Sequence, residues 1–329
     1  MTARARIQDL IGACALLPAL LMALDGRAGA LEVLGGPEPR PLLLSDNGPD
    51  LTDVAGSLGR VMFPNAPQES GDASHQTVVT ATLIAPDLLL TTAHAFFHTD
   101  TDTAPGPVPG DLPRAQMRAV CTIERETRAF RWIACHGMRF LPAFAPNHTE
   151  TGERKVRHCL HFAAYPGADG LGQEAVCVLT RPAALSVSPL PLSPAETIDP
   201  SLPVLVPFMA QRQSKTQATR WDAVVAEACQ VIVDRSLLRP GSFAGPSGHA
   251  LRHYCAIWPG GSGAPVLQRS PTGGTLEIIG IHLGERYTRG DIVRQVGDRR
   301  FVPPHRFNGR TANVAVSTKR LAVLLEALD

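Results

Sequence analysis

The sequence lacks any long block of charge of one sign. Its 31 basic and 30 acidic side chains leave a net charge of +1. Proteins that bind nucleic acid or an anionic membrane surface need a concentrated positive patch, and no such patch is visible here. Lysine is also scarce, but we give its scarcity no functional weight. The composition therefore predicts no nucleic-acid partner and leaves small or peptide-like partners open.

Apolar runs long enough to cross a membrane are missing as well. The most apolar stretch, residues 10–24, has 15 residues, whereas a spanning helix needs about 20. Arg4 and Arg6 precede this stretch, and the small residues 28–30 follow it. That order is typical of a cleaved signal peptide. We expect residues 1–30 to be removed and the mature chain to be secreted or periplasmic, free of the membrane.

Cysteine is infrequent, but its number is informative. Removal of the signal peptide takes Cys14 with it and leaves six cysteines. An even number in an exported chain predicts disulfides. The sequence cannot choose among the possible pairings, and we expect pairs of cysteines that are sequential along the chain. The six are Cys121, Cys135, Cys159, Cys177, Cys229 and Cys255.

A metal site is the competing interpretation of one cysteine. The segment "HCLH" brings His158, Cys159 and His161 together in sequence. On a regular strand His158 points away from the other two, so the three ligands converge only if the segment is a turn or a helix. An oxidising compartment also favours the disulfide over the ligand. We therefore expect no metal.

Short β-branched runs, bounded by turns rich in proline and glycine, predict an all-β fold. The predicted strands are 77–85, 88–92, 174–180, 202–208, 221–234, 276–284 and 312–316. One helix is predicted at the end of the chain, where Ser317 can cap a segment whose leucines share one face. These are Leu321, Leu324, Leu325 and Leu328, and we expect them to pack on the last barrel.

Two stretches carry side chains suited to nucleophilic catalysis. "LLLTTAHAFF" (88–97) places His94 at the end of an apolar strand. "PGGSGAPVL" (259–267) places Ser262 in a glycine-rich turn, where backbone N–H groups can converge beside an exposed hydroxyl. A lone histidine is more often a core residue, and glycine–serine turns are common. Together, the two stretches predict a base and a nucleophile.

This pair of motifs resembles those of the trypsin-like (chymotrypsin-fold) serine proteases, particularly the secreted bacterial members. "TTAHAF" is similar to the histidine motif of that family, "GGSGAP" to its nucleophile motif, and "IIGIHLG" to the strand that lines its specificity pocket. The resemblance covers about residues 55–329. It implies two six-stranded antiparallel barrels with a C-terminal helix and a site in the cleft between them.

We accordingly divide the chain into five parts. Residues 31–55 form an N-terminal extension or propeptide after the signal peptide. The first β-barrel is expected at 56–187, a proline-rich linker at 188–203, and the second β-barrel with its helix at 204–329.

The resemblance also implies roles for individual residues. His94 is the general base, Ser262 attacks a peptide carbonyl to form an acyl-enzyme, and the N–H groups of Gly260 and Ser262 hold the oxyanion. The partner is then a protein or peptide substrate of a monomeric enzyme that needs no cofactor. Gly261 stands where many members have an aspartate that pairs with a freed N-terminus. We therefore expect activity not to require a defined new N-terminus.

The third catalytic position departs from the family pattern. In "QEAVCVLTRP" (173–182), Gln173 occupies the place of the family's aspartate. Glu174 is adjacent, but on a regular strand it points to the opposite face and serves only through a bulge. Asp169 could reach back instead. A glutamine does not stabilise an imidazolium by charge, so the alternative of a weakened or inactive binding protein stays open.

Substrate preference depends on His282, within "IIGIHLG". It resembles the pocket histidine of glutamyl endopeptidases, and a cationic imidazole suits a carboxylate. Ala256 is expected in the same pocket, but residues 256–258 lack the hydroxyl groups that would help. Preference for glutamate is therefore an expectation to be tested.

Overall fold

The computed structural model describes residues 32–34, 39–42, 49–64, 76–98, 116–144, 153–163, 174–183, 189–193, 198–213, 219–231, 250–258, 260–270, 273–286, 294–296, 299–301 and 312–328. The predicted signal peptide, Asp169 and Gln173 lie outside these residues.

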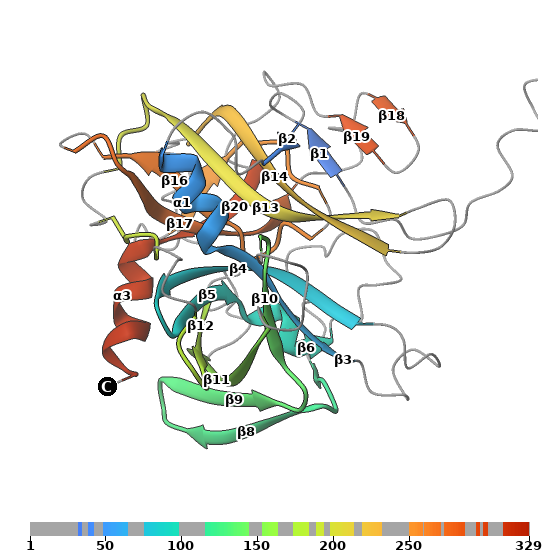
Figure 1. The fold of residues 1–329 in the computed structure, drawn as a ribbon, viewed down its shortest axis with the longest axis vertical. Coiled ribbons are helices and arrows are strands. Elements are labelled where there is room, and N and C mark those ends of the chain that lie inside the picture. The colour runs from blue at the N-terminus through green and yellow to red at the C-terminus, as the bar shows by residue number, and fades with distance from the viewer. Residues whose placement is uncertain are drawn as a thin grey trace, which may run out of the picture.

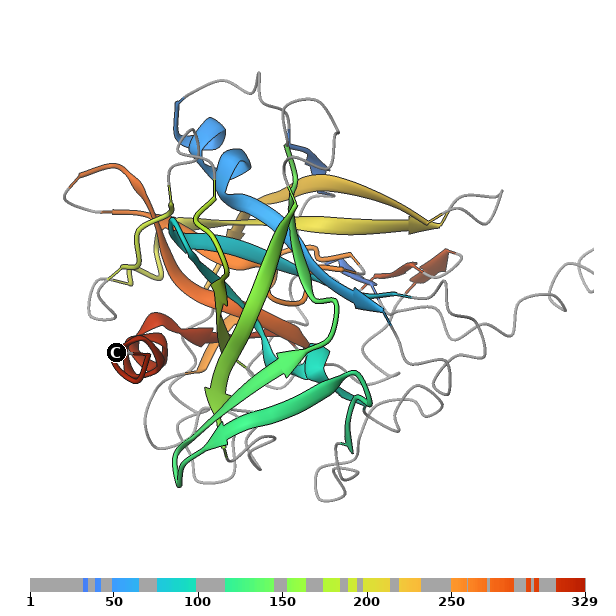
Figure 2. The same ribbon diagram turned by 60° about the horizontal axis from the view of Figure 1, so that its bottom comes forward.

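Six strands close into the first barrel, the lower one in Figure 1. Their order is β10-β3-β4-β5-β12-β11, and pairing of β10 with β11 closes the ring. The hairpin of β8 and β9 continues the sheet beyond β11 and projects from the barrel (Figure 2). The strands are β3 (Leu58–Pro64), β4 (Gln76–Ala85), β5 (Leu88–Thr92), β8 (Cys121–Glu126), β9 (Phe130–Cys135), β10 (Arg139–Pro142), β11 (Arg154–Phe162) and β12 (Glu174–Leu179).

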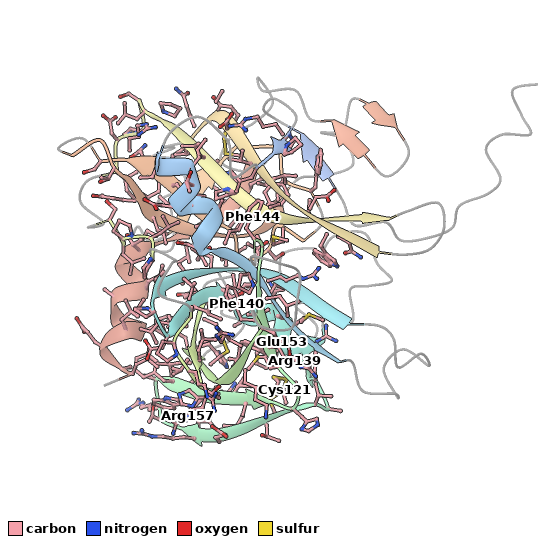
Figure 3. The ribbon with its side chains drawn as sticks, in the orientation of Figure 1. Cys121, Arg139, Phe140, Phe144, Glu153 and Arg157 are labelled. Atoms are coloured by element: carbon pink, nitrogen blue, oxygen red, sulfur yellow. A yellow bond between two sulfur atoms is a disulfide. The ribbon has the colours of Figure 1, made fainter. Side chains whose placement is uncertain are left out.

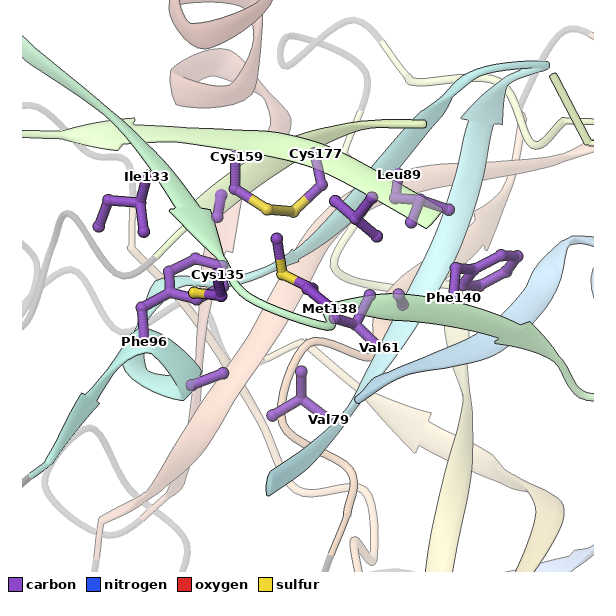
Figure 4. Packing of buried hydrophobic residues seen from close by; sticks show 14 of the residues in the cluster. Val61, Val79, Leu89, Phe96, Ile133, Cys135, Met138, Phe140, Cys159 and Cys177 are labelled. Carbon is purple, nitrogen blue, oxygen red and sulfur yellow. A yellow bond between two sulfur atoms is a disulfide. The ribbon is translucent and has the colours of Figure 1, made fainter. Parts of the chain in front are cut away.

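Apolar side chains fill the interior of this barrel together with the cysteines of two disulfides, one of which crosses from β11 to β12 (Figure 4). Val61, Leu89 and Phe140 are fully buried there. The disulfide between β11 and β12 joins Cys159 and Cys177, which are direct partners on these strands. Alternation along β5 turns Leu89 into the barrel and Leu90 toward the second barrel. A strand buried on both faces needs a continuous apolar run, which is why "LLL" is its sequence signature.

The second barrel is a curled seven-stranded sheet of order β15-β20-β17-β16-β13-β14-β2. Its ends meet through a single bridge between Val231 and His253 and through the disulfide Cys229–Cys255. Its strands are β2 (Arg40–Pro41), β13 (Pro203–Gln213), β14 (Thr219–Gln230), β15 (Ala250–His253), β16 (Pro265–Arg269), β17 (Leu276–Arg286) and β20 (Ala312–Ser317).

Helix α3 (Thr318–Glu326) follows β20 and packs against strands of both barrels. Leu321 and Leu324 are fully buried in a cluster that also contains Leu90 of the first barrel and Ile278 of the second. The predicted helix is thus confirmed, although it contacts more than the last barrel. Ser317 occupies the N-cap position, but its side chain makes no capping hydrogen bond.

Smaller elements complete the described structure. They are β1 (Glu32–Leu34), α1 (Pro49–Ser57), the 3-10 turn η1 (Ala93–Phe96), β6 (Phe97–His98), β7 (Gln116–Met117), β18 (Arg294–Val296) and β19 (Arg299–Phe301). Within the described residues, no helix has the length and apolarity to span a bilayer.

The predicted all-β double barrel with a C-terminal helix is confirmed. The predicted sequential disulfide pairing is confirmed as well, and the third bridge is Cys121–Cys135.

Part of the predicted N-terminal extension is built into the second barrel. β2 pairs with β14, and the Arg40 guanidinium donates two hydrogen bonds of 2.8 Å to the Glu227 carboxylate. The Leu42 N–H donates to the Ala223 carbonyl at 2.9 Å, and its side chain is only 2% exposed. A start site for the folded chain therefore has to lie before Arg40.

We predict that a form starting at Glu38 is nearly as stable and as active as one starting at Leu31, because it keeps β2 and loses the short pairing of β1 with β19. A form starting at Ser45 loses β2 and the buried Leu42. Leu42→Ala alone should lower the free energy of unfolding by about 2–5 kcal/mol, as expected for a buried leucine. Urea unfolding of the four proteins tests this. Equal stability of the Glu38 and Ser45 forms would show that β2 is dispensable.

Candidate functional site

Thr80, on β4, joins the serine turn to the first barrel. Its hydroxyl donates to the Gly260 carbonyl at 2.7 Å and accepts the Met209 N–H at 3.0 Å. Its own N–H donates to the Ser262 carbonyl at 2.9 Å. Because Thr80 is fully buried, water does not compete for these bonds. They fix the backbone on both sides of Gly261 against the first barrel.

The turn itself depends on glycines. Gly260 and Gly263 have φ of +97° and +84°, which disfavours any residue with a Cβ. A Cβ on Gly263 would press against the Thr80 carbonyl oxygen and lie 2.9 Å from Thr91 Oγ1. This close approach lets the turn lie directly against β4 and β5. The residue after Ser262 therefore lies against β5, the strand that leads to His94.

Two backbone N–H groups of the turn remain available. Gly261 donates its N–H to the Trp258 carbonyl at 3.1 Å, and Gly263 donates to the His282 carbonyl at 2.9 Å. The N–H groups of Gly260 and Ser262, which alternate with these two along the turn, have no acceptor among the described residues. An oxyanion site needs two such uncommitted donors beside the nucleophile.

His94 lies in η1, directly after β5, and is half-buried. Its neighbours Ala93 and Ala95 are buried in the first barrel. The His94 Nδ1 lies 2.9 Å from Thr92 Oγ1. In the described part of the chain the Ser262 hydroxyl has no hydrogen-bond partner. Serine–histidine bonds are often loose in enzymes without substrate and tighten when it binds.

The register between β12 and β5 determines which face of the sheet carries Glu174. Glu174 begins β12 and pairs directly with Thr92 of β5, in a register without a shift. Side chains of directly opposed residues share one face of a sheet. Glu174 therefore lies on the face where Thr92 meets His94, and its side chain is fully buried. Gln173 and Asp169, the other two candidates, lie outside the described residues.

His282 is buried next to the serine turn and is paired with a second histidine. His253 Nε2 lies 3.1 Å from His282 Nδ1, and His253 Nδ1 accepts the Cys255 N–H at 3.3 Å. A neutral His253 with an acceptor at Nδ1 carries its proton on Nε2 and donates it to His282 Nδ1. Because His282 Nδ1 accepts this hydrogen bond, the proton of a neutral His282 is on Nε2. Ala256 is fully buried and follows Cys255 directly.

The electrostatics of this pair differ from the cationic imidazole that the sequence suggested. Burial lowers the pKa of His282 well below 6.5, and charges on His253 and His94 lower it further. Burial also lowers the pKa of His253 to about 3. Both imidazoles are therefore neutral near pH 7, and His282 acts there as a neutral N–H donor.

The three residues of "HCLH" do not form a metal site. Cys159 is in a disulfide. His158 lies near Glu124, with 3.8 Å between Nδ1 and Oε2, whereas His161 is buried against Phe97. Burial lowers the pKa of His161 to about 4. The segment is the strand β11, so alternation separates the two histidines.

Sequence reasoning missed Thr80, Thr92 and His253. Thr80 and Thr92 lie in β-branched strands, where a threonine is ordinary, and only strand pairing shows what they touch. His253 lies 29 residues before His282 in the chain, outside the motifs that the sequence analysis singled out. No local signal marks any of the three.

Comparison with known proteins adds little to this geometry. No protein-family model matches the chain, and no curated protein matches its sequence. One similar solved structure is a scabies mite inactivated protease paralogue, S-D1, with 11% identity over 82% of this chain and 91% of that one (TM-score 0.47). Another is neuropsin, a serine protease expressed in the limbic system of mouse brain, with 11% identity over 89% and 99% (TM-score 0.48). The strand order itself identifies a chymotrypsin-like double barrel.

We predict that Thr80→Val destabilises the protein, because it leaves the buried Met209 N–H and Gly260 carbonyl unpaired. Each such loss costs about 1–3 kcal/mol. Thr82→Val is the matched control, since Thr82 is equally buried on the same strand and its hydroxyl has no hydrogen-bond partner among the residues that the structure describes. Urea unfolding should show a clear loss for Thr80→Val and little change or a gain for Thr82→Val. Equal effects would contradict the role given to Thr80.

Proposed function

We propose that the chain is an exported serine endopeptidase that hydrolyses peptide bonds through an acyl-enzyme. The observation that carries the proposal is the serine turn. It carries two N–H groups, those of Gly260 and Ser262, that have no acceptor among the described residues, and Thr80 links it by hydrogen bonds to the barrel that carries His94. The three disulfides suit an oxidising compartment outside the cytoplasm.

In this mechanism Ser262 Oγ attacks the carbonyl carbon of the substrate and gives its proton to His94 Nε2. The oxyanion that forms accepts hydrogen bonds from the N–H groups of Gly260 and Ser262. His94 then gives the proton to the departing amine. Water, deprotonated by His94, hydrolyses the ester and restores Ser262. No cofactor is needed.

We assign the acid of the site to Glu174 acting through Thr92. If the Thr92 hydroxyl donates a hydrogen bond to the Glu174 carboxylate, its oxygen can accept one from the Nδ1–H of His94. The proton of neutral His94 is then on Nδ1, and Nε2 is free to act as the base. A buried carboxylate on this face also stabilises the imidazolium that forms. The observation in favour is the direct pairing of Glu174 with Thr92, together with the 2.9 Å contact of Thr92 Oγ1 with His94.

We predict that an organophosphate labels Ser262 in the parent protein and that Ser262→Ala abolishes labelling. Glu174→Gln should lower turnover by about 10⁴-fold, as replacement of a triad carboxylate by its amide does. Thr92→Val should also lower turnover, because it removes the hydroxyl that contacts His94 Nδ1. Glu126→Gln, at an exposed glutamate of the first barrel, is the control.

Labelling rates and peptide hydrolysis measure these effects. If Gln173→Asp raises turnover strongly while Glu174→Gln does nothing, the acid has been misassigned. If a folded parent protein is neither labelled nor active, the alternative of an inactive protease-fold binding protein holds.

We further propose that His282 favours substrates with an acidic residue before the scissile bond. Its backbone pairs with Gly263 and Ala264, the two residues that directly follow Ser262. A bound carboxylate raises the pKa of a neighbouring imidazole, so His282, neutral in the free protein, takes up a proton when such a substrate binds.

We predict that the preference for glutamate over glutamine substrates grows as the pH falls from 8 to 6. The gain is up to about tenfold per pH unit where one proton is taken up. The ratio of kcat/KM for the two substrates at each pH measures it, and titration of His94 cancels from the ratio. Equal cleavage after Glu, Leu and Arg would remove His282 from the specificity pocket.

A further inference from the structure

A cavity of about 870 Å³ lies between the first barrel, Leu192 and helix α3. This volume is within the range of small-molecule and peptide sites. Leu88 and Val178 line it, and these paired residues lie at the ends of β5 and β12 opposite Thr92 and Glu174. Since a strand rises about 3.3 Å per residue, the two ends are about 13 Å apart. The cavity is thus separate from the candidate active site.

One wall of the cavity is apolar. Trp132 of β9 and Leu325 and Leu328 of the C-terminal segment contribute to it. Leu325 and Leu328 are partly exposed, although their partners Leu321 and Leu324 on the same helix are fully buried. A ligand with an apolar side chain would cover this surface.

Two guanidinium groups also line the cavity. Arg125 lies over the Trp132 ring, 4.4 Å from its centroid. Arg157 lies on the side of the first barrel near β8 and β9 (Figure 3). Among the described residues neither forms an ion pair with a carboxylate. Two exposed arginines beside an apolar surface suit a ligand that has both an anionic group and an apolar part.

Acidic groups narrow the class of ligand. Glu124 and Asp87 also line the cavity. Glu124 lies near His158, a histidine whose pKa is lowered by burial and by the charge of Arg157. A fatty acid has no donor for these two carboxylates. A peptide has backbone N–H groups that can meet them.

We propose that this cavity binds the free C-terminal end of a peptide whose last side chain is apolar. The terminal carboxylate lies between Arg125 and Arg157, and the last side chain packs on Trp132, Leu325 and Leu328. Glu124 and Asp87 accept N–H groups from the preceding residues. Capture of a chain terminus by a few fixed polar groups is a known mode of peptide recognition. The proposal does not depend on catalysis.

The experiment uses the full exported chain carrying Ser262→Ala, so that no probe is hydrolysed. The probe is a fluorescent tetrapeptide ending in leucine, with a free carboxylate or with a C-terminal amide. Fluorescence anisotropy should show about tenfold or greater weakening on amidation, on Arg157→Gln and on Arg125→Gln, since each removes a charged hydrogen bond. Leu328→Ser should weaken binding several-fold.

Arg128→Gln is the control, because Arg128 is exposed in the turn of the same hairpin and does not line the cavity. It should leave the affinity unchanged. Equal affinity for the acid and the amide, or equal effects of Arg157→Gln and Arg128→Gln, would overturn the proposal. So would binding of decanoate in the absence of any peptide binding. Ser262 labelling in the parent protein tests the protease proposal separately.

Discussion

The arrangement of the candidate site depends on the hydrogen bonds of one buried side chain, Thr80. Its hydroxyl and N–H hold the serine turn of the second barrel, and its carbonyl accepts the Thr91 hydroxyl of β5 at 2.8 Å. The same residue thus contacts the turn that carries Ser262 and the strand that leads to His94. A base and a nucleophile need this precision, since an error of about 1 Å in position can cost about 10²-fold in rate.

A shared apolar core supports these polar contacts. Leu90 of β5 and Val176 of β12 face away from the first barrel and join the cluster that contains Ile278 and Leu321. Leu89 and Cys177, their neighbours on the same strands, fill the barrel itself. The two strands that present Thr92 and Glu174 are therefore packed on both faces. Close packing on both faces limits their movement, which suits a site that has to be formed before substrate arrives.

The sequence predicted those parts of the molecule that have a local signal. The apolar runs of β5, β12 and β17 were located to within about two residues, and the predicted glycine-rich turn around Ser262 is present. The face of Glu174 was not predictable, because it depends on the register between β12 and β5, and one residue of slip reverses it. β8 was missed since "CTIERE" is almost wholly exposed and has no apolar alternation. The contact of His253 with His282 exists only once β15 and β17 both lie beside β20.

The packing around Gly261 bears on whether the site needs an external charge to form. A Cβ at this position would press against Ile257 and lie 3.2 Å from the Trp258 carbonyl, so the aspartate of the proteases that the chain resembles has no room here. The turn is instead held by internal bonds, from Gly261 N–H to Trp258 and from Ala264 N–H to Gly261. The N-terminal segment around Arg40 is fixed elsewhere, on the edge of β14. Among the described residues, the turn around Ser262 is therefore held without a contact from this N-terminal segment, which is the basis for the expectation that activity does not require a defined new N-terminus.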